Sequence, residues 1–189
     1  LADYGVERVF SVPGESFLAA PDGLYERGIP NVDCRHEGGA AFMAEAMGKL
    51  TGRPGVAFVT RGPGATNAAC GVHVARQDST PMILFVGQIA RGHRDREAFQ
   101  EVDYRAVFGP LAKWATEVDQ VERLPEYISR AFHVAMSGRP GRGGSTILPP
   151  SDNWSKLSEV RPRSGNQSKN EPPANTTIKR IANRKPGMA

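Results

Sequence analysis

The fold is decided by residues 56–86, VAFVTRGPGATNAACGVHVARQDSTPMILFV. Two unbroken apolar runs, at 56–60 and 82–86, flank a glycine-rich turn and a segment with helical character over roughly 66–76. Apolar runs without alternation are typical of parallel strands that are covered on both faces. A strand, a helix and a second strand in this order predict one repeating unit of an α/β sheet.

The same alternation continues on both sides of this unit. We predict further strands at 8–12, 31–35 and 145–148, and helices at 16–27, 39–50, 102–108 and 124–137. The charged segment at 91–97 is expected to be a solvated surface loop. Together these elements predict a single three-layer α/β/α domain over residues 1–150, with a central, mostly parallel sheet.

The C-terminal segment, residues 151–189, differs in character from this domain. It contains eight Lys or Arg and three Asp or Glu, so residues 1–150 carry 16 basic and 17 acidic side chains. The segment has too little apolar surface to offset its chain entropy, and we expect it to be disordered. Because the globular part is nearly neutral, its charge gives no case for nucleic-acid binding.

The ends and the cysteines suggest a cytoplasmic fragment. The chain opens with LADYG, which shows neither an initiator Met nor a signal-peptide pattern, and we interpret it as N-terminally truncated. No apolar run reaches the ~20 residues that span a bilayer, so no membrane contact is expected. Cys34 and Cys70 have no metal-ligand spacing, and two free thiols fit a reducing cytoplasm.

Four glycine-bearing turns follow the predicted strands: 13–15 (PGE), 36–39 (HEGG), 61–64 (RGPG) and 87–88 (GQ). In an open parallel sheet, ligands bind at the carboxyl ends of the strands. Glycine lets a backbone approach a ligand closely, so four such turns at equivalent positions predict a binding crevice there. The turn at 60–67 lacks both the P-loop ending and the dinucleotide fingerprint, which disfavours a nucleotide-binding protein.

Glu37 is the ionisable residue that stands out in these turns, because it precedes two glycines and an apolar helix. A carboxyl group among apolar neighbours holds its proton more readily, which suits acid–base work. From the residues alone, a structural carboxylate favoured by the helix dipole is the commoner alternative. For His36 we expect a structural hydrogen bond, and for Glu45, in the same helix, a solvated or interface position.

Six strings, taken together, resemble one known family in their order and spacing. They are VPGE (12–15), RHEGGAA (35–41), TGRPGV (51–56), TRGPGATN (60–67), REAFQE (96–101) and SGRPG (137–141). The chain resembles, over roughly residues 5–141, the N-terminal pyrimidine-binding domain of thiamine-diphosphate enzymes of the acetolactate synthase group.

This resemblance implies a role for seven residues. Glu37 matches the glutamate that hydrogen-bonds the aminopyrimidine ring and so promotes formation of the C2 ylide, which attacks a 2-keto acid. Phe99 and Gln100 match the element that faces the reacting centre. The positions implied around the pyrimidine, in the turn over the active site or at the subunit contact are Gly14, Thr60, Pro63 and Asn67.

The resemblance also implies parts that this sequence lacks. The family holds the diphosphate through Mg²⁺ in a second domain, whose Gly-Asp-Gly signature is absent, and some members bind FAD in a middle domain that is absent too. We therefore expect no metal ligands here, and a homodimer or a complementary diphosphate-binding domain or chain as partner. After Gly141 the family pattern stops, and we interpret residues 151–189 as the product of a frameshift or a misjoined gene end. The alternative is a non-enzymatic module whose basic tail contacts nucleic acid or acidic partners.

Overall fold

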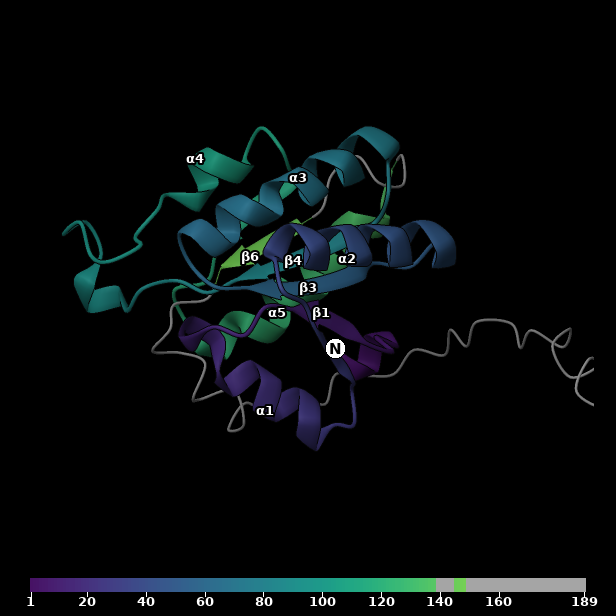
Figure 1. Ribbon diagram of the computed structural model, residues 1–189, viewed down its shortest axis with the longest axis horizontal. Coiled ribbons are helices and arrows are strands. Elements are labelled where there is room, and N and C mark those ends of the chain that lie inside the picture. The colour runs from purple at the N-terminus through teal and green to yellow at the C-terminus, as the bar shows by residue number, and fades with distance from the viewer. Residues whose placement is uncertain (139–144, 149–189) are drawn as a thin grey trace, which may run out of the picture.

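The computed structural model describes residues 1–138 and 145–148, and within them six parallel strands form one sheet in the order β2-β1-β3-β4-β6-β5 (Figure 1). The strands are β1 (Val9–Ser11), β2 (Asn31–Asp33), β3 (Gly55–Val59), β4 (Met82–Val86), β5 (Trp114–Glu117) and β6 (Ser145–Leu148). The helices are α1 (Ala19–Glu26), α2 (Glu37–Thr51), α3 (Pro63–Asp78), α4 (Tyr104–Phe108) and α5 (Leu124–Met136). Single 3-10 turns occupy Ala2–Tyr4, Glu15–Phe17, Arg91–His93 and Val121–Arg123.

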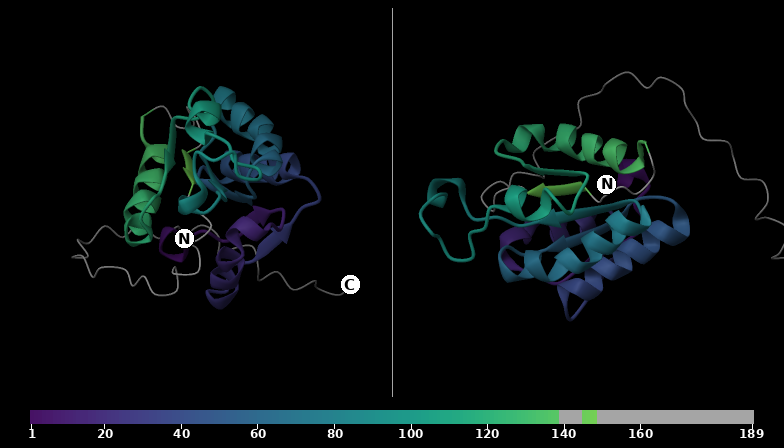
Figure 2. Two further views of the ribbon diagram at one scale, coloured as in Figure 1. Left: turned by 90° about the vertical axis from the view of Figure 1, so that its left-hand side faces the viewer. Right: turned by 90° about the horizontal axis from the view of Figure 1, so that it is seen from above.

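Helices cover both faces of the sheet, which confirms the three-layer prediction. Helices α2, α3 and α4 lie on one side, and α1 and α5 lie on the other (Figures 1 and 2). Alternate residues of β3 face opposite sides of the sheet. Ala57 and Val59 pack with α2 and α3, whereas Val56 and Phe58 pack with α1 and α5. Because both faces of each central strand are buried, the strand sequence shows no polar alternation.

The edge strand β5 was missed in the sequence. Of its four residues only Thr116 is buried, and the strand pairs on one side with β6. A half-buried edge strand of mixed composition carries neither an unbroken apolar run nor clear alternation. The possible strand at 145–148 is confirmed as β6, which lies between β4 and β5. The prediction of disorder for 151–189 lies outside the described residues.

Glu45 is buried rather than solvated, which corrects the expectation for this residue. Only 6 % of Glu45 is exposed to solvent, and Thr80 Oγ1 donates a hydrogen bond of 2.8 Å to Glu45 Oε1. Lys49 Nζ lies 3.0 Å from the same oxygen and also contacts Asp78 of α3. A buried carboxylate needs such partners, and here they connect α2 to α3 and to the segment that enters β4.

No helix in the described part of the chain has both the length and the apolar character needed to cross a bilayer.

Candidate functional site

Three of the glycine-bearing turns touch one another at the carboxyl edge of the sheet. Ser16, which follows the turn after β1, hydrogen-bonds through its hydroxyl to Thr60 Oγ1 at 2.9 Å. A Cβ atom on Gly14 would lie 2.5 Å from Thr60 Cβ, and one on Gly87 would lie 1.8 Å from Ser16 Oγ. The turns after β1, β3 and β4 are therefore in direct contact, and the glycines permit it.

Glu37 is the first residue of α2, directly after His36. His36 is the N-cap, and its Nδ1 accepts a hydrogen bond of 3.0 Å from the Gly38 amide, which matches the structural role expected for it. The Glu37 carboxylate thus lies at the positive end of a fifteen-residue helix. It is half-buried and faces α3.

Asn67 and Gly64 of α3 fix the position of the Glu37 carboxylate. Asn67 Nδ2 donates a hydrogen bond of 3.0 Å to Oε2. A Cβ atom on Gly64 would lie 3.2 Å from Oε1 and 2.7 Å from Thr60 Cγ2. No hydrogen-bond donor among the described residues reaches Oε1. One carboxylate oxygen is therefore held by a hydrogen bond, and the other lies beside Gly64 with no donor among the described residues bonded to it.

The turn that starts α3 places Thr60 and Pro63 at this edge. Gly62 has φ 59° and ψ −119°, a conformation that strongly favours glycine, and Pro63 occupies the first helical turn. This start explains why α3 begins three residues before the predicted boundary at 66. Thr60 is half-buried beneath Gly14, and Pro63 is exposed at the surface of the turn.

Tyr104 holds the same turn from the other side, and the sequence analysis missed it. Its side chain is almost fully buried, and its hydroxyl oxygen accepts a hydrogen bond of 2.5 Å from the Gly62 amide. Burial raises the pKa of Tyr104 above its ordinary value. An aromatic residue in a short helix gives no sequence signal for a contact 42 residues away.

Replacing Tyr104 with Phe is expected to lower the unfolding free energy by about 1–3 kcal/mol, because the buried Gly62 amide loses its acceptor. The raised pKa means that the folded state holds the phenol proton more tightly than the unfolded state, so this contribution is complete below pH 10.0 and is lost as the pH rises further. Urea unfolding should show a clear difference in unfolding free energy between the parent and the variant at neutral pH. This difference should shrink at a pH above the ordinary tyrosine pKa. A difference between them that does not change with pH would contradict this assignment.

The loop at 94–101 carries Phe99 and Gln100 and is ordered by internal contacts. Glu101 accepts hydrogen bonds from the amides of Asp95 (2.8 Å) and Ala98 (3.1 Å), and these bonds lower the pKa of Glu101. Arg94 pairs with Glu101 and with Glu117 of β5. The expectation of a purely solvated segment at 91–97 is therefore wrong for Arg94.

Gln100 and Phe99 take different positions in this loop. Gln100 has φ 62°, and its Cβ lies 2.7 Å from the position that a Cβ on Gly62 would take, so it packs against the start of α3. Phe99 is 77 % exposed. The structure thus gathers Gly14, Glu37, Thr60, Pro63, Asn67 and Gln100 along adjoining turns, whereas Phe99 points into solvent nearby. Their catalytic and binding roles remain predictions.

Comparison with known proteins identifies the kind of domain. Residues 1–107 match the family described as "Thiamine pyrophosphate enzyme, N-terminal TPP binding domain". The chain belongs to this family. Thiamine pyrophosphate, or TPP, is another name for thiamine diphosphate, so the family resemblance is confirmed. Neither the nucleotide-binding alternative nor the non-enzymatic module is favoured.

Acetolactate synthases are similar to most of this TPP-binding domain. The enzyme of Bacillus subtilis (strain 168) is 40 % identical over 141 residues, 75 % of this chain and 25 % of that protein. The isozyme 3 large subunit of Escherichia coli (strain K12) is 42 % identical over 142 residues, which again cover 75 % of this chain and 25 % of that protein. The mitochondrial catalytic subunit of Aspergillus candidus is 40 % identical over 138 residues, which cover 72 % of this chain and 20 % of that protein. The chain therefore spans about a quarter of the length of the curated relatives it matches.

The residues at the carboxyl edge fit the pyrimidine end of TPP. A flat heteroaromatic ring needs a bare backbone surface and a carboxyl group that reaches its ring nitrogen. Gly64 lies beside Glu37 Oε1 with no side chain of its own to cover that oxygen, and no donor among the described residues bonds to it. The described residues contain no group of three or more His, Cys, Asp or Glu that could hold a metal ion.

Proposed function

We propose that this chain binds the pyrimidine ring of TPP through Glu37, as part of an acetolactate synthase-like enzyme that decarboxylates and joins 2-keto acids. The observation that carries the proposal is the Glu37 carboxylate, with Oε2 fixed by Asn67 at 3.0 Å and Oε1 beside Gly64. When bound, TPP supplies the electron sink for decarboxylation. The protein supplies the position of the ring and one exchangeable proton.

In this proposal Glu37 holds a proton at Oε1 and shares it with the ring nitrogen. Asn67 keeps the carboxyl group from rotating, so that the proton stays aimed at the ring rather than at solvent. The half-buried position beside α3 limits competition by water. General acid–base catalysis of this kind contributes typically about 10²–10⁴-fold to a rate.

The other candidate residues shape the site around this proton. Gly14 and Thr60 pack against each other, and together with Pro63 they form the wall on the β1 and β3 side. Gln100 packs against Gly62 through Cβ and Cγ, and Phe99 offers an exposed apolar surface next to it. We propose that these two residues face the 2-keto acid.

The diphosphate end of the cofactor requires a partner. We propose that a diphosphate-binding domain, in a second copy of the parent enzyme or in a complementary chain, supplies Mg²⁺ and closes the site. In this division residues 1–150 form the pyrimidine-binding unit and residues 151–189 take no part in catalysis. We place the enzyme in the cytoplasm, which agrees with the free thiols of Cys34 and Cys70.

The isolated chain is expected to bind TPP only weakly and to leave pyruvate unchanged, because half of the cofactor's contacts would be missing. Titration calorimetry of the full chain with TPP and Mg²⁺ should give no micromolar association, and a parallel titration with thiamine, which lacks the diphosphate, should look the same. Micromolar binding of TPP that exceeds the binding of thiamine, and that Glu37→Gln weakens, would contradict the proposed division of the site.

A further inference from the structure

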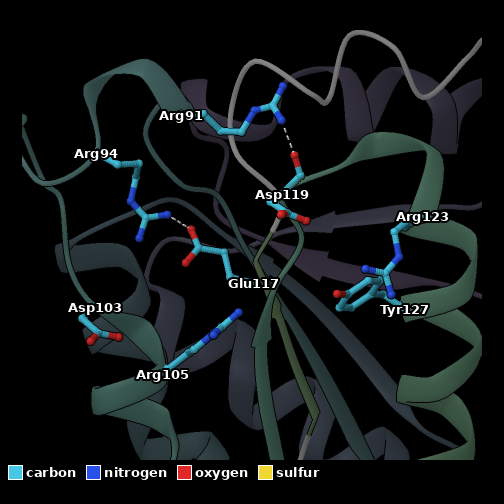
Figure 3. A pocket seen from close by; sticks show the side chains of 8 residues that line it. All are labelled: Arg91, Arg94, Asp103, Arg105, Glu117, Asp119, Arg123 and Tyr127. Atoms are coloured by element: carbon cyan, nitrogen blue, oxygen red, sulfur yellow. Dashed lines mark hydrogen bonds and ion pairs between the residues drawn. The ribbon is translucent and has the colours of Figure 1, made fainter.

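A pocket of about 400 Å³ opens at the carboxyl edge of the sheet, beyond the candidate TPP site (Figure 3). It lies between the segment after β4, the start of α4, the end of β5 and the start of α5. Strands β1, β3, β4 and β6 separate β5 from β2, the strand that leads into Glu37. None of the residues assigned to the cofactor or to the 2-keto acid lines it.

Arginine side chains dominate the lining, with four guanidinium groups from three different segments. Arg91 and Arg94 come from the segment after β4, Arg105 from α4, and Arg123 from the start of α5 (Figure 3). Three carboxylates also line the pocket, and two more, those of Glu101 and Glu126, pair with the lining residues Arg94 and Arg123. Guanidinium groups present planar forks of N–H donors that match oxyanions in charge and geometry.

The carboxylates that line the pocket are already engaged by the protein. Glu117 forms an ion pair with Arg94 at the wall of the pocket. Asp103 is the N-cap of α4, where its Oδ1 accepts a hydrogen bond of 3.0 Å from the Ala106 amide. Both negative charges are therefore partly neutralised, and Asp119, the third carboxylate at the pocket, is also a residue with an interaction partner in the protein.

Arg105 is the guanidinium best able to accept a ligand. It is exposed on α4, and in the described part of the chain no carboxylate lies within ion-pair distance of it. Its side chain extends toward the middle of the pocket (Figure 3). Arg91 is held in place by a hydrogen bond of 2.5 Å to the Asp119 carbonyl oxygen, which orients a second donor group at the rim.

The amino end of α5 adds to the positive potential. Arg123 and Tyr127, at the start of this thirteen-residue helix, both line the pocket. Arg123 is the N-cap, and its side chain does not bond to the helix amides. Its guanidinium pairs with Glu126 at 2.9 Å and lies over the Tyr127 ring, 5.0 Å from the ring centroid. The helix dipole and the arginines therefore favour the same sign of ligand.

We propose that this pocket is a binding site for a small multivalent oxyanion, a molecule that bears phosphate or carboxylate groups. Its volume leaves room for more than one such group, and the donors come from separate segments, so a ligand with two charged groups would bridge α4 and α5. This inference does not depend on the role of Glu37 or on TPP.

Titration of the full chain with inorganic pyrophosphate, and separately with citrate, tests the proposal by calorimetry at low ionic strength. We expect saturable binding of one equivalent that weakens as salt is added. Arg105→Ala should weaken the binding about tenfold, which corresponds to about 1.4 kcal/mol. Arg8→Ala removes the same charge from an exposed position just before β1, at the opposite edge of the sheet, and should leave the binding unchanged.

Asp119→Asn provides a second variant that does not remove a donor. It should tighten the binding several-fold, because one opposing charge is lost from the lining. Binding of pyrophosphate alone would assign the site to phosphates, and binding of citrate alone would assign it to carboxylates. No saturable binding of either probe, or equal weakening by Arg105→Ala and Arg8→Ala, would overturn the proposal.

Discussion

Replacing Glu37 with Gln is expected to lower TPP-dependent turnover of pyruvate by at least about a hundredfold, the lower range for loss of a positioned proton-transfer group. Glutamine keeps the size of the side chain, and its carbonyl oxygen can still accept the hydrogen bond from Asn67. The remaining amide group of glutamine can donate a hydrogen bond, but it cannot transfer a proton to or from the ring nitrogen. The loss should therefore appear in kcat, with a smaller change in the TPP concentration needed for half-maximal rate.

An assay for this effect requires the proposed diphosphate-binding domain as well as residues 1–150. The stretch similar to the Bacillus subtilis acetolactate synthase can be exchanged for its counterpart in that enzyme, since the two are 40 % identical over 141 residues. The exchange gives a chimaera in which the variants and the parent are compared directly. Turnover of pyruvate and the exchange rate of the TPP C2 proton are then measured on the same protein.

Two further variants separate a proton-transfer role from a structural one. Glu26→Gln removes a carboxylate of the same type from the exposed end of α1 and should leave turnover unchanged. Asn67→Ala frees Oε2 but leaves the proton, so we expect a smaller loss, about tenfold, for one hydrogen bond. If Glu37→Gln retained full turnover and full C2 exchange, the assignment of Glu37 would be wrong.

Replacing Gly55 with Ala is expected to lower the unfolding free energy by about 3 kcal/mol or more, at the upper end for overpacking in a core. A Cβ atom on Gly55 would lie 1.8 Å from the Ala44 carbonyl oxygen and 2.7 Å from its carbonyl carbon. The obstacle is the backbone of α2, which cannot move aside as a flexible side chain could. Relief therefore requires the helix to shift away from β3.

Gly39→Ala is the matched control for this prediction. Gly39 lies in the first turn of α2, and nothing lies within 4 Å of an added Cβ atom. Alanine should leave stability unchanged or raise it by up to about 1 kcal/mol, because it restricts the unfolded chain. Urea unfolding of both variants measures the difference. Equal unfolding free energies would show that the contact between α2 and β3 is not tight.

A shift of α2 would also reach the candidate site. The helix carries Glu37 at its start and Ala44 two turns later, so displacement at Ala44 moves the carboxylate relative to Asn67. Gly55→Ala is therefore expected to lower turnover in the chimaera even under conditions in which it folds. The Gly39 variant is used as a control for stability only and not for turnover, because Gly39 lies in the same helical turn as Glu37.

The sequence by itself determined the α/β class, five of the six strands and the position of Glu37 after β2. These features depend on local patterns: unbroken apolar runs for β3 and β4, and glycine-bearing turns at strand ends. The family strings added the identity of the domain, because several of them in fixed order are far more specific than any one. Residue type and spacing were sufficient for these conclusions.

Only the tertiary structure decided the strand order, the burial of Glu45 and the contacts that shape the site. β6 lies between β4 and β5, Tyr104 holds the Gly62 turn, and the arginines of three segments meet at one pocket. Each of these depends on residues that are far apart in the chain and meet only when helices pack on the sheet. Local propensity carries no information about such partners, because the free energy that selects them comes from burial and hydrogen bonding in the folded state.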